Sequence, residues 1–516
     1  MTEKLTRLLL CNMTTLKGKR ILILQQRGWS RAIGRFLARK LAGEGCSLAT
    51  ITFQPAAHEF IINQKEVKYE MIISNDEVID NPLTYLAGDN FSLKEICAEL
   101  GVDSIWPMVY ALRHFVKSYK DKYYFSFKKS KSDEEIIDYV KATYKYIRLI
   151  FEKFKPDIII AANFVSLPHI MINLYGLKHN VPMFGVMNSM TSGYYIFVND
   201  YLGSRGDFHN RIDELNLQSK ESPNQQKAKK YIEEFRENFK QPNQGTYYTP
   251  ENKSWIEKLK HELLPYREIL RWYLKKRPNF VKNIGISIDY RPPRIVLRDH
   301  YCEKHYRKYM ENLDYYPLEK LGKFVYFPLQ FQPETVIDTV SPYFSNQIET
   351  ARLVAMSLPD DYTLVVKEHP AMIGVRSPSY IEKLVRTVNV KMIDYRIPSE
   401  TILRKTDLVV NAGGTILSEA AMYKKPVIQL GNMGTTLKLP NVFKHTDLTT
   451  LTKKIKEVLA INLNTEEYER KLENYVTAAF DTGFGFNYVA AWERGKGDME
   501  ELWRIYKKEL EKNFSK

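Results

Sequence analysis

The sequence predicts an α/β protein with two Rossmann-like halves. Strand-like apolar runs alternate with amphipathic helical segments over residues 20–200, and the same alternation returns over residues 323–431. This order is typical of a parallel sheet with helices on both faces. At 516 residues, the chain is also too long for one ordinary core. We therefore expect two lobes that face each other across a cleft.

The first half begins with the apolar strand Arg20–Leu24, followed by a turn at Gly28 and a helical pattern that ends near Ala42. Further strands of this half are expected at 47–53, 158–161 and 181–186. In the second half, strands are expected at 324–328, 362–366, 388–393, 408–410 and 426–430, with helices at 346–357, 379–387 and 416–423.

The change in pattern along the chain predicts four segments. These are an N-terminal Rossmann-like domain over 1–200, a basic helical insertion over 201–320, a C-terminal Rossmann-like domain over 321–490, and a last helix over 491–516. We expect the last helix to pack back on the N-terminal domain.

Composition excludes several classes of protein. The 44% hydrophobic and 13% aromatic content is globular, and the four scattered cysteines include no Cys-x-x-Cys pair. The most apolar long stretch, residues 158–177, is interrupted by Asn163, Pro168 and His169, which argues against a membrane span. We expect a cytoplasmic protein without a metal or a resident cofactor.

Two loops carry most of the functional signal. Lys367-Glu368-His369-Pro370 and Asn411-Ala412-Gly413-Gly414-Thr415 each follow a buried strand, at the sheet edge where ligands bind. The first loop offers a cation, Lys367, and an imidazole, His369, that can contact a phosphate. The two glycines of the second loop allow close approach of the backbone to an anion at a helix start. Glu419 lies one turn inside this helix and could accept hydrogen bonds from a ribose.

A third loop, Leu329–Glu334, follows the first strand of the second half. Gln330 and Gln332 offer amides for a base or phosphate, and Glu334 offers a carboxylate. In the first half, the equivalent loop contains Arg27 and Trp29, which could face the cleft. Asn188 and Asp200 close later segments of that half and are further candidates. For each of these first-half residues, a structural role is favoured over a catalytic one.

These motifs resemble those of bacterial capsule polysaccharide biosynthesis proteins. The resemblance rests on Tyr326–Glu334, the Lys-Glu-His-Pro loop, the segment Asn411–Glu419 with the following Lys425–Ile428, and the Gly-aromatic run that ends at Asp200. It implies a GT-B glycosyltransferase fold and a nucleotide sugar as donor, with CMP-Kdo or a related ulosonic acid favoured. His369, Gly413, Gly414, Thr415 and Ser418 would then contact the nucleotide and its phosphate.

For catalysis we expect His369 to stabilise the leaving phosphate, and either Glu334 or Asp200 to act as the carboxylate. The predicted donor site comprises Gln330, Gln332, Lys367, His369, Gly413, Gly414, Thr415, Ser418 and Glu419. The acceptor-side candidates are Arg27, Trp29 and Asn188. The acceptor itself would be a lipid-linked or growing glycan.

The net charge of +15 is concentrated in the middle of the chain, where residues 258–308 hold 14 Lys and Arg against 5 Asp and Glu. Apolar side chains recur at helical spacing between these charges. Such a stretch, 255–308, could rest on an anionic membrane surface at the inner face of the cell membrane, or could dock on the second lobe with its charges in water. No recognised nucleic-acid-binding module accompanies the charges, so we do not expect nucleic-acid binding.

Three other functions fit the same motifs. The protein could be a glycosyltransferase that uses a UDP-sugar, a UDP-sugar 2-epimerase of the same fold, or a non-catalytic scaffold of a polysaccharide assembly complex. An epimerase would isomerise its nucleotide sugar without transfer, and a scaffold would not depend on His369.

Overall fold

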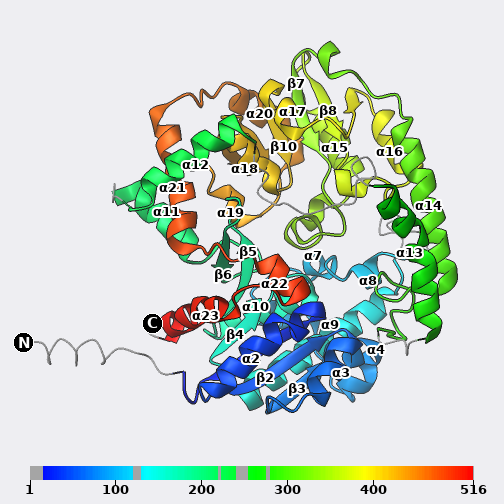
Figure 1. Cartoon of the computed structure of the whole chain (residues 1–516), viewed down its shortest axis with the longest axis vertical. Coiled ribbons are helices and arrows are strands. Elements are labelled where there is room, and N and C mark those ends of the chain that lie inside the picture. The colour runs from blue at the N-terminus through cyan, green and yellow to red at the C-terminus, as the bar shows by residue number, and fades with distance from the viewer. Residues whose placement is uncertain (1–15, 120–128, 219–221, 240–253, 275–278, 515–516) are drawn as a thin grey trace, which may run out of the picture.

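The computed structural model describes residues 16–119, 129–218, 222–239, 254–274 and 279–514 (Figure 1). It contains two lobes, each built on a six-stranded sheet, which confirms the predicted fold class. The strands of the first lobe are β1 (Arg20–Gln26), β2 (Ser47–Phe53), β3 (Met71–Ser74), β4 (Ile158–Ala161), β5 (Met183–Asn188) and β6 (Tyr195–Val198). The strands of the second lobe are β7 (Phe324–Pro328), β8 (Thr363–Lys367), β9 (Val390–Ile393), β10 (Leu408–Asn411), β11 (Val427–Gln429) and β12 (Val442–Lys444).

Helices surround both sheets. Those of the first lobe are α2 (Ile33–Gly43), α3 (Pro55–Asn63), α4 (Asn75–Asp80), α5 (Pro82–Leu86), α6 (Leu93–Leu100), α7 (Trp106–Val109), α8 (Arg113–Val116), α9 (Asp133–Leu149) and α10 (Leu167–Lys178). The middle of the chain forms α11 (Asp207–Gln218), α12 (Gln225–Glu237), α13 (Trp255–Leu274) and α14 (Pro293–Glu311). The remaining helices are α15 (Gln347–Met356), α16 (Pro378–Val385), α17 (Ser399–Lys405), α18 (Thr415–Met422), α19 (Gly434–Leu437), α20 (Leu451–Leu459), α21 (Glu466–Thr482), α22 (Tyr488–Arg494) and α23 (Met499–Phe514).

The first sheet has the order β3-β2-β1-β4-β5-β6, in which only β6 runs antiparallel to its neighbour. Alternate side chains of β1 enter opposite faces, as the pleat of a strand dictates. Ile21 and Ile23 pack in one apolar cluster with α2 and α23. Leu22 and Leu24 pack in another with α9 and α10. Burial on both faces explains why these strands read as continuous apolar runs.

The second sheet is entirely parallel, in the order β12-β11-β10-β7-β8-β9. Pro328, Lys367 and Ile393 lie level with one another at the ends of β7, β8 and β9. The loops that follow these strands therefore leave the sheet side by side, at the edge that faces the first lobe.

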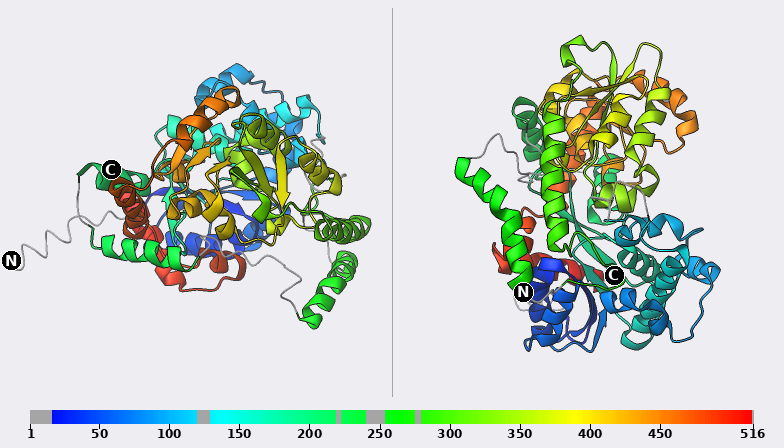
Figure 2. Two further views of the ribbon diagram at one scale, coloured as in Figure 1. Left: turned by 90° about the horizontal axis from the view of Figure 1, so that it is seen from above. Right: turned by 90° about the vertical axis from the view of Figure 1, so that its right-hand side faces the viewer.

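The middle of the chain divides into two parts instead of forming a single insertion. Helices α11 and α12 pack on α21, where Arg211 contacts Asp481 at 2.8 Å and Arg236 contacts Glu469 at 2.9 Å. Helices α13 and α14 pack on each other, and α13 stands out from the body of the molecule (Figure 2).

The end of the chain returns to the first lobe. The return begins at Phe484, which pairs with Tyr195, the first residue of β6, so it starts before the predicted boundary at residue 490. Helix α23 then packs on α2 and contributes Leu502, Tyr506 and Leu510 to the core of the first lobe. The lobes also touch through a buried ion pair between Lys117 and Asp338, at 3.1 Å.

Candidate functional site

The three loops singled out in the second lobe line one side of a cavity between the lobes, here called the interlobe cavity. They follow β10, β7 and β8, which are neighbours in the sheet. The cavity has a volume of about 440 Å3. Its opposite wall comes from the ends of β4 and β5, including Asn163, Met187 and Asn188. A cavity at the carboxyl ends of parallel strands is the usual ligand position in such folds.

The glycine loop takes a conformation that glycine alone adopts readily. Gly414 has a φ of +101°, directly before α18. A Cβ on Gly414 would stand 3.2 Å from the side-chain oxygen of Gln330. The Gln330 amide in turn donates to the Gly413 carbonyl at 2.7 Å. Gly414 and Thr415 line the cavity, so the N–H groups that start α18 lie at its wall, where an anion would be stabilised.

Lys367 and Glu419 are two buried groups of opposite charge type at the wall, and each influences the pKa of the other. Lys367 is 5% exposed and donates to the Ile397 carbonyl at 2.8 Å. Burial lowers its pKa to about 8, and the neighbouring Glu419 opposes this shift. Burial raises the pKa of Glu419 to about 7, against the effects of its hydrogen bond with Thr415 and of Lys367. Both groups therefore change protonation close to neutral pH.

His369 is held as a neutral hydrogen-bond donor. Its Nδ1 accepts from the Ala371 N–H at 3.1 Å, which leaves the proton of the neutral ring on Nε2. Burial lowers its pKa to about 4, and the charges of Arg376 and Lys367 act in the same direction. His369 lines the cavity next to the Phe331 ring, at 5.9 Å between ring centroids. The imidazole can thus donate to a phosphate oxygen without carrying a charge of its own.

A buried ion pair fixes the Lys-Glu-His-Pro loop from behind. Glu368 and Arg376 are each 1% exposed, and Arg376 contacts the Glu368 carboxylate directly. Arg376 also donates to the Gln330 carbonyl at 2.5 Å. It therefore connects two of the three loops. Sequence reasoning missed Arg376, because it lies in a loop without a motif of its own.

Glu334 is the carboxylate of the third loop, and it lines the cavity. Burial raises its pKa to about 7, and the charge of Asp338 adds to this effect. The Glu334 N–H donates to Asp338 at 3.2 Å, and Asp338 pairs with Lys117 of the first lobe. Glu334 is therefore a candidate acid or base in the wall of the cavity.

Two predicted positions of the first lobe lie elsewhere. The prediction that Trp29 faces the cleft is wrong: its side chain is fully buried, and its indole N–H donates to the Tyr488 hydroxyl at 2.8 Å. Asp200 does not line the interlobe cavity. Its carboxylate accepts from the N–H groups of Ser204 and Arg205, at 2.7 and 2.9 Å, and so stabilises a turn.

Two predicted residues of the second lobe are also structural. Ser418 is 1% exposed and donates to the Thr415 carbonyl inside α18. Gln332 is 2% exposed, and its amide donates to Asp338 and to the Ser345 carbonyl. Neither side chain lines the cavity. They support the loops that do.

The two remaining first-lobe candidates, Asn188 and Arg27, line different cavities. Asn188 lines the interlobe cavity and accepts from the Met190 N–H at 2.7 Å. Arg27 lines a different cavity, inside the first lobe, and pairs with Asp289 at 3.2 Å.

The loop after β9 also reaches the interlobe cavity, and sequence reasoning missed it. Tyr395, Arg396 and Ser399 line the wall next to Lys367. The signal was available, because this loop follows a strand of the same sheet as the other three. The loop was missed because it contains no glycine or histidine that would mark it as a ligand-binding loop. Arg396 is exposed and pairs with Asp394 at 3.2 Å, so it offers a further cation at the cavity.

Within the described residues, no group of three or more His, Cys, Asp or Glu side chains is arranged to hold a metal ion. Among the helices of the same residues, none combines the length and the apolar character that crossing a membrane requires.

A family model described as capsule polysaccharide biosynthesis protein matches residues 228–434. This confirms, for that part of the chain, the resemblance noted from the motifs. The matched range contains β7 to β11 and every second-lobe loop of the interlobe cavity. A search of curated proteins found no match.

Three solved structures with similarity to the chain each share 12% sequence identity with it. For KpsC of Thermosulfurimonas dismutans, a β-Kdo 2,7 transferase, 73% of this chain and 89% of that chain are covered, with a TM-score of 0.33. For S. aureus MnaA with UDP, 94% of this chain and 97% of that chain are covered, with a TM-score of 0.26. For the Methanocaldococcus jannaschii UDP-GlcNAc 2-epimerase in complex with UDP-GlcNAc and UDP, 87% of this chain and 97% of that chain are covered, with a TM-score of 0.24. At these TM-scores the similarity carries no argument about what this chain binds.

Proposed function

We propose that this protein is a glycosyltransferase that uses a nucleotide sugar to build a capsule or another surface polysaccharide. One observation carries the proposal. The second-lobe loops that meet in the interlobe cavity all belong to the stretch that matches the capsule polysaccharide family. A volume of about 440 Å3 also lies in the range of small-molecule sites.

In this proposal the second lobe binds the nucleotide end of the donor. The start of α18 and the Nε2–H of His369 donate to the phosphate oxygens. Glu419 accepts from ribose hydroxyls, and Lys367 balances its charge. No metal is needed for this arrangement, because N–H groups and nearby cations stabilise the charge that develops on the leaving phosphate.

The transfer step is a substitution at the anomeric carbon. The bond from the anomeric carbon to the phosphate oxygen breaks, and its electron pair stays on the phosphate. An acceptor hydroxyl forms the new bond and gives its proton to a carboxylate, for which we assign Glu334. Because its pKa is about 7, Glu334 is available in both protonation states at neutral pH.

For the donor, we favour CMP-Kdo or a related ulosonic acid, with a UDP-sugar as the alternative. This preference comes from the resemblance of the motifs. A thermal-shift experiment with CMP, UDP and GDP tests it, because a ligand that binds only the folded state raises the melting temperature. We expect CMP to stabilise the protein and His369→Ala to reduce this stabilisation. Stabilisation by UDP without CMP would overturn the preference, and stabilisation by no nucleotide would overturn the proposed function.

An activity experiment separates transfer from the other functions. Incubation with a radiolabelled nucleotide sugar and a glycan acceptor should yield labelled glycan. Isomerised nucleotide sugar without labelled glycan would indicate an epimerase. Normal polysaccharide synthesis in cells that carry His369→Ala would instead indicate a scaffold. His445→Ala is the matched control, since His445 is a histidine of the same lobe outside the cavity.

We also propose that α13 rests on the anionic inner face of a membrane. All of its exposed apolar side chains except Leu264 form one stripe, because positions spaced at about 100° per residue bring them to a common face. The stripe comprises Trp255, Ile256, Leu259, Leu263, Tyr266, Leu270, Tyr273 and Leu274. Lys260, Arg267 and Arg271 flank it on one side, as anionic headgroups would require. Helix α13 packs on α14, where Glu262 contacts His300 at 3.6 Å, and Glu268 of α13 contacts Arg291, which precedes α14, at 2.8 Å.

Vesicle flotation tests this surface. The full chain should float with vesicles that contain phosphatidylglycerol and remain behind with pure phosphatidylcholine. The double variant Leu259→Glu/Leu270→Glu should lose flotation, because it places carboxylates in the stripe. Val388→Glu is the control, because Val388 is 87% exposed in the second lobe, away from the stripe. Unchanged flotation of the double variant would contradict the proposal.

A further inference from the structure

The first lobe contains a second cavity, here called the first-lobe cavity, which the proposed donor site does not use. It has a volume of about 240 Å3. Its floor consists of the carboxyl ends of β1 and β2 and the start of α4 after β3. Its roof is the segment 279–289, which precedes α14. The first-lobe cavity thus lies at the ligand-binding edge of the first sheet, as the interlobe cavity does for the second.

Three buried polar atoms at this cavity have no hydrogen-bond partner among the described residues. They are Asp76 Oδ2, His169 Nε2 and Asn279 Oδ1. The three residues come from α4, α10 and the roof, and all line the cavity. A buried polar atom without a partner is destabilising, so native structures rarely keep three around one cavity. Two of the three are oxygens, which accept hydrogen bonds from the donors of a ligand.

The charges around the cavity cancel. Arg27 and Arg113 stand against Asp76 and Asp289, and Arg27 pairs with Asp289 at 3.2 Å. Burial lowers the pKa of His169 to about 3, so its ring is neutral at pH 7. Burial raises the pKa of Asp76 to about 7, so the four charges cancel when its carboxylate is ionised, above that pH. These surroundings favour a neutral ligand over an ionic one.

The walls also offer apolar surface. Phe53, Phe115 and Trp492 line the cavity, and Phe53 stacks on the His169 ring at 4.5 Å between centroids. Ser166 fixes that ring through Nδ1 at 2.7 Å, so that Nε2 remains for a ligand. A sugar ring combines hydroxyl groups at its edge with apolar C–H faces. It therefore matches both the unpartnered atoms and the aromatic walls.

The two cavities are neighbours. Asn163, which follows β4, lines both of them. Gln26 holds its side chain with a hydrogen bond of 2.6 Å. We propose that the first-lobe cavity binds a neutral, hydroxyl-rich sugar unit, which Asp76, His169 and Asn279 hydrogen-bond. That this sugar belongs to the acceptor glycan rests on the function proposed above.

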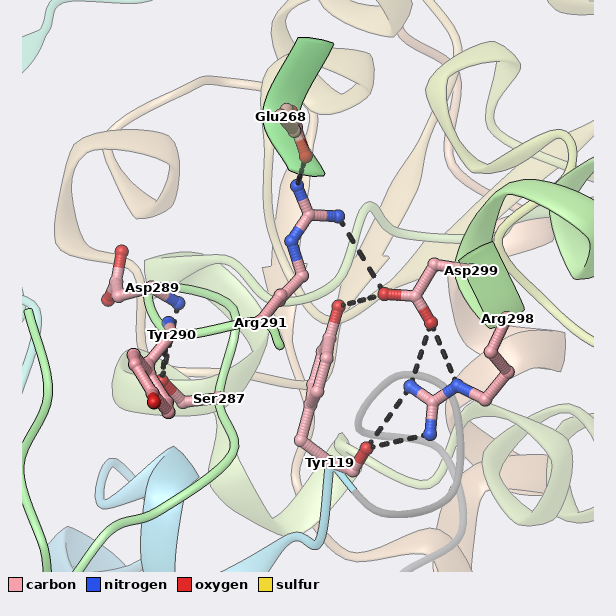
Figure 3. A network of polar contacts seen from close by, with 8 residues as sticks. All are labelled: Tyr119, Glu268, Ser287, Asp289, Tyr290, Arg291, Arg298 and Asp299. Carbon is pink, nitrogen blue, oxygen red and sulfur yellow. Dashed lines mark hydrogen bonds and ion pairs between the residues drawn. The ribbon is translucent and has the colours of Figure 1, made fainter. Parts of the chain in front are cut away.

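A polar network holds the roof in place (Figure 3). At its end, the Ser287 hydroxyl accepts hydrogen bonds from the N–H groups of Asp289 and Tyr290, at 3.3 and 3.2 Å, and so holds a tight turn. Arg291 then connects the roof to Glu268 of α13 at 2.8 Å and to Asp299 of α14 at 3.7 Å. The hydroxyl of Tyr119, from the first lobe, donates to Asp299 at 2.9 Å. The same network thus positions the roof of the sugar site and the helix proposed to meet the membrane.

Saturation-transfer NMR on the full chain tests the site. The probes are the methyl glycosides of glucose, galactose and N-acetylglucosamine, with glucuronic acid as the charged comparison. We expect at least one neutral glycoside to bind with a dissociation constant on the order of millimolar, and glucuronic acid to bind more weakly. Absence of transfer to every neutral glycoside would overturn the proposal, because water alone would then satisfy the three atoms.

Two variants locate the binding. Asp76→Asn and Asn279→Ala should each weaken the glycoside by on the order of tenfold, since each removes or alters one hydrogen-bond acceptor. Asn279 lies in a loop, so Asn279→Ala should leave the fold intact. It therefore still tests the site if Asp76→Asn fails to fold. Glu59→Gln is the matched control, because Glu59 is an exposed carboxylate of α3 outside the cavity. Equal transfer in wild type and both variants would place the sugar elsewhere and contradict the proposal.

A nucleotide titration of the same samples separates this proposal from the function above. The cavity variants should keep the stabilisation that CMP or UDP gives to the wild type. If no nucleotide stabilises the wild type while glycoside binding depends on Asp76, the proposed function fails and the sugar site stands. If nucleotides bind and the glycosides do not, the sugar site is disproved and the proposed function stands.

Discussion

The two cavities are built in different ways. The polar wall of the interlobe cavity comes from one lobe, from loops after four neighbouring strands. The first-lobe cavity needs three distant parts of the chain: the first sheet, the roof over 279–289, and Trp492 near the C-terminus. The proposed nucleotide end of the site thus depends on the second lobe alone, while the proposed sugar end depends on how the middle and the end of the chain fold back.

The substitution expected to affect the interlobe cavity most strongly is Arg376→Met. This change leaves Glu368 buried without its partner, which typically costs about 3–5 kcal/mol. We expect a large drop in the melting temperature and loss of nucleotide stabilisation. Arg386→Met is the control. Arg386 forms an exposed ion pair with Glu382, and such a surface pair contributes less than about 1 kcal/mol to stability. Similar melting temperatures for the two variants would show that the Glu368 pair does not hold the loops.

A smaller and more local effect is expected from Gly414→Ala. The φ of +101° disfavours any side chain, at a cost of about 1–3 kcal/mol, and the new Cβ would press on Gln330. Nucleotide stabilisation should fall sharply, while glycoside binding to the first-lobe cavity stays unchanged. Gly322→Ala serves as the control, since nothing lies within 4 Å of its Cβ position. A loss of both ligands in Gly414→Ala would mean that the cavities are not independent.

The pH dependence of Glu334 tests the chemistry of the interlobe cavity. Its pKa is raised from 4.5 to about 7 in the folded state, so the folded protein binds more protons than the unfolded chain between these values. This group therefore lowers the free energy of unfolding as the pH rises from 4.5 to 7. Glu334→Gln should remove this contribution, so its melting temperature should fall less between pH 5 and pH 8 than that of the wild type.

Transfer activity should show the opposite trend. Because Glu334 must be deprotonated to accept the proton of the acceptor hydroxyl, the rate should rise as the pH increases through about 7. Glu334→Gln should be inactive, with nucleotide binding retained. Glu466→Gln, an exposed carboxylate of α21, is the control. A pH profile of transfer that is unchanged in Glu334→Gln would assign the base to another residue.

The smallest effect is expected from Arg291→Met, which loosens the roof of the first-lobe cavity. Arg291 is half-exposed, so its ion pairs with Glu268 and Asp299 contribute about 1 kcal/mol or less. Glycoside affinity should fall by about two- to fivefold in NMR titrations. Nucleotide stabilisation should stay at the wild-type level, and Arg294→Met gives the matched control in the first turn of α14. A change in nucleotide binding would connect the roof to the donor side.

The sequence predicted the second lobe better than the first for a physical reason. Around the interlobe cavity, each functional residue follows its strand directly, so strand periodicity and local motifs place Lys367, His369 and Gly414 together. In the first-lobe cavity, Asp76, His169 and Asn279 meet only through tertiary packing, which no local pattern reveals.

Trp29 illustrates the same limit. An aromatic residue directly after the first strand suggested a cleft position, but Tyr488 accepts its indole N–H from more than 450 residues away in the sequence. The separation of α11 and α12 from α13 and α14 was hidden for the same reason. Their partners, α21 on one side and the roof network on the other, lie outside any local window.

The packing of α23 on α2 has a consequence for folding during synthesis on the ribosome. The core of the first lobe includes Leu502, Tyr506 and Leu510, yet its last strand, β6, ends at Val198. About 300 residues separate β6 from α23, so at about 5–20 residues per second a ribosome needs about 15–60 s to supply the missing helix. During this interval the part of the apolar face of α2 that α23 covers is exposed, while the rest packs on β1 and β2. The first lobe is thus the first to be synthesised and the last to be completed, which makes the emerging chain a natural client for chaperones.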